Sequence, residues 1–237
     1  MLQVLLLVLS AIVPVGVFLF FIYRKDTEKE PLKLLGKCLL WGCIIAIPAV
    51  LIDLVLGLFN VFHAPFFRSF YEAFVVAALV EELLKFLCLY WIIWKHKEFD
   101  QFFDGIVYAV FVSLGFALVE NIGYVLEHGF ATSIVRAILA VPGHGLYGVV
   151  MGYFFSLARF ATDPSKRKKM LWLCVLLPVI FHGIYDFILM YTTSDDVNVF
   201  LSLLLWLVGI AFVIYLWKTG LKYIKEHHAK DIERIKL

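Results

Sequence analysis

Long apolar runs of about 20 residues alternate with short polar segments along nearly the whole chain. A run of this length crosses the hydrocarbon core of a bilayer as an α-helix, because a rise of about 1.5 Å per residue then spans about 30 Å. We predict an all-α polytopic membrane helix bundle, one domain over residues 1–237. Its seven expected transmembrane helices are Leu2–Tyr23, Cys38–Phe59, Glu72–Trp94, Gly105–Leu126, Ile134–Phe160, Leu171–Tyr191 and Val199–Trp217.

The composition agrees with a membrane protein. Hydrophobic residues make up 63% of the chain and charged residues 17%, with a mean hydropathy of +0.92. The first run is too long for the apolar part of a signal peptide, and no small-residue cleavage site precedes Arg24, so we expect a retained anchor. The four cysteines show no metal-type spacing and are expected to be reduced thiols.

The basic residues predict the orientation. Of the 21 Lys and Arg residues, 18 lie in alternate loops and in the C-terminal segment. The positive-inside rule places these segments in the cytoplasm, so the N-terminus is expected outside and the C-terminus inside. Residues 218–237 are expected to form a basic amphipathic tail at the cytoplasmic surface, in contact with anionic lipid headgroups.

Ionisable residues inside the predicted helices are the candidates for chemistry. One charge at the centre of a membrane helix costs roughly 2.5–3.5 kcal/mol, and the segment Glu81–Lys85 carries three. From the helical rise of about 1.5 Å per residue, we estimate that the polar residues of four predicted helices lie roughly 8–15 Å below the outer face. This shared layer, at or just outside the midplane, contains Glu81, Glu120, His144, His182 and Asp186.

Helical spacing suggests how these side chains cooperate. His182 and Asp186 are four residues apart, so the carboxylate can orient the imidazole. Lys85 can pair with either Glu81 or Glu82, which are four and three residues away respectively. The two glutamates point about 100° apart, so we expect one to face a cavity and the other to hold a neighbouring group.

Other polar and small residues are expected to be structural. Asp53 is predicted to pair with Arg136, and Asp104 to cap the helix that follows it. The segment Pro142–Gly145 is expected to break its helix around His144 and open a cavity there. Gly105 and Gly183 are expected to open space beside the polar groups.

Taken together, these motifs resemble the PrsW family of intramembrane proteases, whose members make the first cut in a membrane-bound anti-sigma factor. The resemblance covers most of the chain, from about the third to the sixth predicted helix. The matching motifs are Glu81-Glu82-Leu83-Leu84-Lys85, Phe103-Asp104-Gly105, Glu120-Asn121, His144 and His182-Gly183-Ile184-Tyr185-Asp186.

The wider clan includes the CAAX prenyl endopeptidases, and this chain departs from their pattern. Lys85 comes one position early, Phe116 is followed by Glu120 rather than histidine, and Asp186 stands where asparagine would. These departures favour the PrsW branch, with a CAAX-type endopeptidase as an alternative.

The resemblance implies a membrane protease of the glutamic type, with catalytic helices over about 72–191. It implies that Glu81 or Glu82 activates water, that His144 or His182 assists at the carbonyl or the leaving amine, and that Asp186 orients His182. Peptide hydrolysis would occur near the outer half of the bilayer. The candidate catalytic residues are therefore Glu81, Glu82, Glu120, His144, His182 and Asp186, with Lys85 and Asn121 in support.

No cofactor is expected, and the alternative is zinc. Glu120, His144 and His182 could bind Zn²⁺ from separate helices, with Glu81 as the base. The sequence has no HExxH or other local zinc motif.

Two further function classes stay open from the residues alone. Buried Glu, Lys and His also build the proton relays of coupled transporters, although the chain has no paired hydropathy halves. A non-catalytic receptor or scaffold would tolerate loss of the polar residues. On the protease reading, the expected partner is a single-pass, anti-sigma-factor-like membrane protein in a stress response, at a bacterial plasma membrane. No nucleic-acid partner is expected.

Overall fold

The computed structural model describes residues 2–194 and 197–235, and these form helices without a β-strand. Within these residues, six helices are long and apolar enough to cross a membrane. The helical elements are α1 (Leu2–Lys25), α2 (Leu32–Gly57), α3 (Pro65–Phe70), the π-helical segment η1 (Tyr71–Ala78), α4 (Leu79–Ile93), α5 (Phe102–His128), α6 (Phe130–Ile138), α7 (Ala140–Arg159), α8 (Pro164–Thr192) and α9 (Val199–Ile235).

The elements follow the predicted spans. The six long segments correspond to α1, α2, α5, α6 with α7, α8 and α9. The remaining predicted span corresponds to α3, η1 and α4, which follow one another without a break over residues 65–93. None of these three pieces is long enough alone to count as a span, because η1 divides the run. π-Helical turns within α-helices are frequent at functional sites, and this one ends three residues before Glu81.

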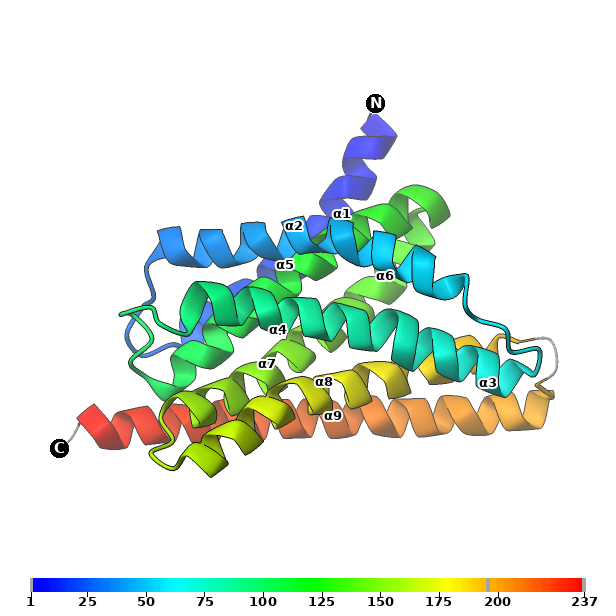
Figure 1. The fold of residues 1–237 in the computed structure, drawn as a ribbon. Coiled ribbons are helices and arrows are strands. Elements are labelled where there is room, and N and C mark those ends of the chain that lie inside the picture. Colours follow the sequence, from blue (N-terminus) through cyan, green and yellow to red (C-terminus); the bar gives the residue numbers. More distant parts are fainter. Residues whose placement is uncertain (1, 195–196, 236–237) are drawn as a thin grey trace.

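The connections that carry the basic residues lie at one end of the bundle. The α1–α2, α4–α5 and α7–α8 connections lie at the same end as the C-terminus, on the left in Figure 1. These are the segments that carry the basic residues. The α2–α3 and α8–α9 connections lie at the opposite end (Figure 1). This arrangement is the one that the positive-inside rule requires of a single orientation.

The most buried helices are α5 and α7, and glycines bring their backbones together. A Cβ atom built on Gly152 would lie 2.3 Å from the carbonyl oxygen of Gly105. On the other side of α5, Gly42 of α2 has the carbonyl oxygen of Val112 2.2 Å from its Cβ position. Small residues permit such close approach of membrane helices. The expectation that Gly105 opens space beside the polar groups is therefore wrong, because its side is filled by α7.

Gly183 is also a packing position. A Cβ atom there would lie 2.3 Å from the ring of Phe74, which belongs to η1. Since His182 precedes this glycine, the close contact holds the histidine of α8 against the helical run that carries Glu82. The space predicted beside Gly183 is absent, because the Phe74 ring occupies it.

The predicted helix break lies earlier than expected. The chain breaks at Leu139, between α6 and α7, and α7 runs continuously through His144. Pro142 falls in the first turn of α7, where its missing N–H has no partner to lose. The prediction of a break around His144 is wrong for this reason.

At the end of the bundle that carries the basic loops, Asp104 acts within a capping box rather than as the cap itself. Gln101 is the N-cap of α5, and Asp104 accepts the backbone N–H of Gln101 at 2.7 Å. The tail predicted from residue 218 is continuous with the last span, since α9 extends from Val199 to Ile235. Its Asp231 accepts the backbone N–H groups of Phe102 and Phe103, which anchors the tail to the start of α5.

Candidate active site

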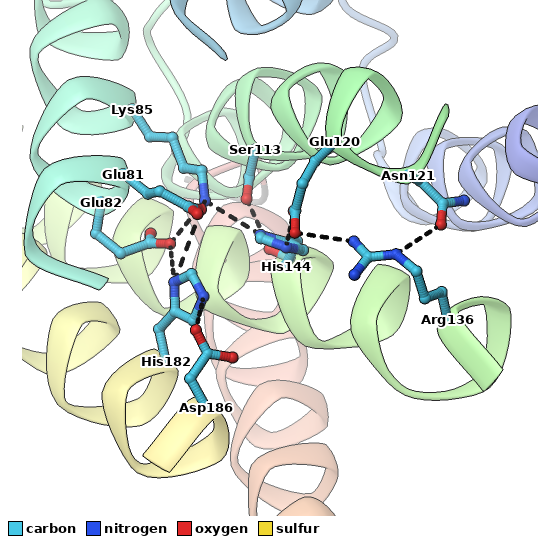
Figure 2. A network of polar contacts seen from close by, with 10 residues as sticks. All are labelled: Glu81, Glu82, Lys85, Ser113, Glu120, Asn121, Arg136, His144, His182 and Asp186. Atoms are coloured by element: carbon cyan, nitrogen blue, oxygen red, sulfur yellow. Dashed lines mark hydrogen bonds and ion pairs between the residues drawn. The ribbon is translucent and has the colours of Figure 1, made fainter. Parts of the chain in front are cut away.

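The buried ammonium of Lys85 is the centre of the polar cluster (Figure 2). Its Nζ lies 3.0 Å from Glu81 Oε2 and 2.8 Å from Glu82 Oε1. It also lies 3.1 Å from Nδ1 of His144, which comes from α7. The spacing of three and four residues thus brings both carboxylates onto one cation, as the sequence predicted for either. Charges at this depth must be paired, because an isolated buried ion is strongly disfavoured.

His182 of α8 is enclosed by carboxylates on both ring nitrogens. Its Nδ1 lies 3.0 Å from Glu82 Oε1 and its Nε2 lies 3.2 Å from Asp186 Oδ2. Both neighbours are acceptors, so the ring is best satisfied with a proton on each nitrogen. The predicted pairing of His182 with Asp186 is present in the structure.

His144 links the Lys85 cluster to a second ion pair. Its Nε2 lies 2.8 Å from Glu120 Oε2 on α5. Because Lys85 can only donate, the Nδ1 of His144 accepts and the ring proton belongs on Nε2, facing Glu120. Glu120 also pairs with Arg136, at 3.0 Å between Oε1 and Nη2.

Arg136 has different partners from those predicted. Besides Glu120, its Nε donates to the Asn121 side-chain oxygen at 2.9 Å. Asn121 in turn donates to the backbone oxygen of Ala11 on α1. The prediction that Asp53 pairs with Arg136 is wrong, because Glu120 and Asn121 take the guanidinium. Asn121 contacts the outer side of Arg136 and does not reach the cluster centre (Figure 2).

A cavity of about 1010 Å³ lies against this cluster. It extends to His128 and Thr193, at the ends of α5 and α8 away from the basic loops. Its polar lining includes Asp53, Glu81, Glu120, Arg136, His144, Tyr147, His182 and Asp186.

The cavity separates the roles of the two adjacent glutamates. Glu81 lines it, whereas Glu82 does not and is 0% exposed. Glu82 contacts Lys85 and His182, at 2.8 and 3.0 Å, without itself lining the cavity. The 100° difference along the helix therefore gives one glutamate that reaches the cavity and one that holds the other side chains.

The structure adds Tyr147 to the site, which the sequence reasoning missed. Its ring stacks on His182, with centroids 5.0 Å apart and planes inclined by 20°. Tyr147 follows His144 by three residues on α7, so helical spacing was the available signal. A tyrosine in an apolar run looks like packing, and only the position of α8 makes it part of the cluster.

Comparison with known proteins decides the family. A family model described as "PrsW family intramembrane metalloprotease" matches residues 30–217. The chain belongs to the PrsW family. "Protease PrsW" of Geobacillus kaustophilus (strain HTA426) is 37% identical over 221 residues, which cover 93% of this chain and 91% of the relative.

Other relatives agree over the same length. "Protease PrsW" of Clostridioides difficile (strain 630) is 36% identical, covering 95% of this chain and 94% of the relative. The protein of the same name from Bacillus subtilis (strain 168) is 34% identical, with 95% and 97% coverage. No solved structure matches the chain. The protein is thus a multi-pass membrane protease, which sets aside the transporter and scaffold readings.

The family description implies a metal, and the residues fit one. Among the described residues, Glu81, His144 and His182 each offer a ligand atom, and these atoms lie within 4.8 Å of one another. Three protein ligands with room for a fourth are typical of catalytic zinc sites, and carboxylates beside the histidines are typical of their surroundings. This set differs from the predicted one by containing Glu81 in place of Glu120, which reaches His144 from the other side.

Proposed function

We propose that this protein cuts a single-span, anti-sigma-factor-like membrane protein near the outer half of a bacterial plasma membrane. The observation that carries the proposal is the cavity, which joins Glu81 and His182 to the end of the bundle away from the basic loops. A transmembrane substrate has its outer segment at that end if the basic end is cytoplasmic. The same cavity would admit water to a site otherwise surrounded by hydrocarbon.

In the proposed reaction, Glu81 takes a proton from a water molecule in the cavity, and the water oxygen adds to the scissile carbonyl carbon. The carbonyl electron pair moves to its oxygen, giving an oxyanion. The C–N bond then breaks as the amine nitrogen takes a proton from His182 or from Glu81. Lys85 and Glu82 hold these two groups in place, at 3.0 Å from Glu81 and His182 respectively.

A metal-dependent form is the second candidate, supported by the donor group and the family description. Glu81, His144 and His182 would hold the ion. A divalent metal supplies a Lewis acid that polarises the scissile carbonyl. The ammonium of Lys85, 3.1 Å from His144 Nδ1, would have to give up that contact if the same nitrogen bound the metal.

The proposed function is tested by co-expression with tagged single-pass candidates, including a membrane-bound anti-sigma factor. We expect wild type to release the outer segment, and Glu81→Gln, Glu82→Gln and His182→Ala to abolish release. Glu98→Gln is the matched control, because Glu98 lies in the α4–α5 connection. Full cleavage by the Glu81 and His182 variants would overturn the proposal.

Removal of metal by chelation distinguishes the metal-dependent mechanism from the glutamate–water mechanism. The metal-dependent form predicts about one bound ion per purified chain, loss of activity on exhaustive chelation and recovery with Zn²⁺. It also predicts that His144→Ala lowers the metal content measured by atomic emission. Unchanged activity in metal-free protein would leave the glutamate–water form.

A further inference from the structure

The hydroxyl of Tyr147 is a buried polar group without a partner. Tyr147 is 1% exposed, and its Oη has no hydrogen-bond partner among the described residues. Leaving a buried donor unsatisfied costs about 1–3 kcal/mol. Such a group in a functional site calls for an explanation, and one explanation is that a ligand completes it.

The position of this hydroxyl relates it to the reacting groups. Tyr147 lines the same cavity as Glu81, His144 and His182. Its ring stacks on His182 and meets the ring of His144 edge to face, with centroids 5.0 and 6.0 Å apart. The phenol is therefore held against both histidines.

The hydroxyl lies over a residue that offers no side chain. A Cβ atom built on Gly143, one turn before Tyr147 in α7, would lie 3.4 Å from the Tyr147 oxygen. Side chains in a helix lean toward its N-terminus, so the phenol points back along α7 over this glycine. Glycine leaves this side of the hydroxyl without a side-chain acceptor.

We propose that Tyr147 is a further catalytic residue, whose hydroxyl donates a hydrogen bond to the oxyanion formed at the scissile carbonyl. The inference rests on the proposed hydrolysis. No proton is transferred: the O–H bond stays intact while the carbonyl electron pair is on oxygen. A preorganised donor in a site shielded from bulk water stabilises the transition state more than the ground state. The substrate would complete the hydrogen bonding that Tyr147 lacks in the free protein.

The test is Tyr147→Phe, which keeps the ring and removes only the oxygen. With the single-span reporter that wild type cleaves, we expect kcat to fall about 10²- to 10³-fold and KM to stay within about twofold. A peptide with a phosphinate at the scissile position resembles the tetrahedral oxyanion. It should bind the variant more weakly than wild type, whereas the unmodified reporter should bind equally to Glu81→Gln with or without Tyr147→Phe.

Tyr153→Phe is the matched control. Tyr153 is on the same helix, and its hydroxyl donates to Glu226 at 2.6 Å, near the cytoplasmic end. The same deletion there should leave kcat unchanged. Wild-type kcat in Tyr147→Phe, while Glu81→Gln is inactive, would overturn this inference and leave the proposed function intact. Activity in Glu81→Gln would instead overturn the proposed function.

A second variant covers the case in which Tyr147→Phe does not fold. Fluorinated tyrosine incorporated at position 147 keeps the shape and makes the phenol more acidic. Because a more acidic phenol is the stronger hydrogen-bond donor, we expect the phosphinate peptide to bind this protein more tightly than wild type. Unchanged phosphinate binding, in a protein with wild-type melting temperature, would contradict the role of Tyr147.

Discussion

At the scale of single residues, Lys85 sets the charge balance of the site. Its ammonium contacts Glu81, Glu82 and His144 and lies 4.3 Å from the centre of the Phe116 ring. Removing one member of a buried ion pair leaves the other charges uncompensated, which is more costly than losing an exposed pair. The lysine is therefore required by its neighbours, whatever its part in catalysis.

We expect Lys85→Ala to lower the free energy of unfolding by about 3–5 kcal/mol and to abolish cleavage. The measurement is unfolding in detergent micelles followed by circular dichroism. Lys97→Ala is the control, because Lys97 pairs with Glu98 at 3.2 Å with its side chain 87% exposed; it should cost about 1 kcal/mol or less. Equal effects of the two substitutions would show that the Lys85 pairs add no stability.

At the scale of elements, the distance between α5 and α7 decides whether Glu120 reaches His144. The close approach depends on Gly105 and on Gly152, whose Cβ position faces only the backbone of Gly105 and Ile106. Backbone cannot move aside without displacing the whole helix. Packing at this seam therefore positions a pair of side chains further along both helices.

We expect Gly152→Ala to separate α5 from α7, lower the melting temperature and reduce cleavage at least tenfold. The reason is that its Cβ atom would lie 2.3 Å from the Gly105 oxygen. The control is Gly16→Ala in α1, where no atom of the described residues outside the local backbone lies within 4 Å of the Cβ position. That change should stabilise the protein by about 0.5–1 kcal/mol, since alanine favours the helix. A harmless Gly152→Ala would contradict the close packing.

At the scale of the whole molecule, a polar cluster near the end with the basic loops joins the α1–α2 connection to α5. Glu30 is buried in that connection and accepts a hydrogen bond from the hydroxyl of Tyr108 on α5. Burial, and then the nearby charge of Asp104, raise the pKa of Glu30 from 4.5 to about 10. Glu30 is thus protonated in the folded protein at neutral pH, whereas the unfolded chain has released that proton.

We expect the free energy of unfolding to fall as the pH rises from about 4.5 toward 10. The folded state binds a proton that the unfolded state lacks in this window, so stability decreases with pH. Glu30→Gln, which is neutral at every pH, should flatten this slope while keeping an acceptor for Tyr108. Melting temperatures of both proteins across the window test this; parallel slopes would exclude Glu30 as the source.

The sequence by itself determined the membrane class, the positions of the helices and most of the ionisable residues of the polar cluster. These follow from local properties: the length of an apolar run, and the cost of a charge that has no other reason to lie within it. Six of the seven predicted spans correspond to helices long and apolar enough to cross a membrane. The predicted residues Glu81, Glu120, His144, His182 and Asp186 all line one cavity.

Only the tertiary structure decided which partners and which position in the site each of these residues has. Which glutamate faces the cavity, which carboxylate holds Arg136, and whether Tyr147 meets His182 depend on how each helix is rotated against its neighbours. Rotation is set by contacts between residues distant in sequence, such as Gly152 with Gly105 and Gly183 with Phe74. A helical repeat determines which residues share a face, but it does not determine which neighbouring helix or cavity that face contacts.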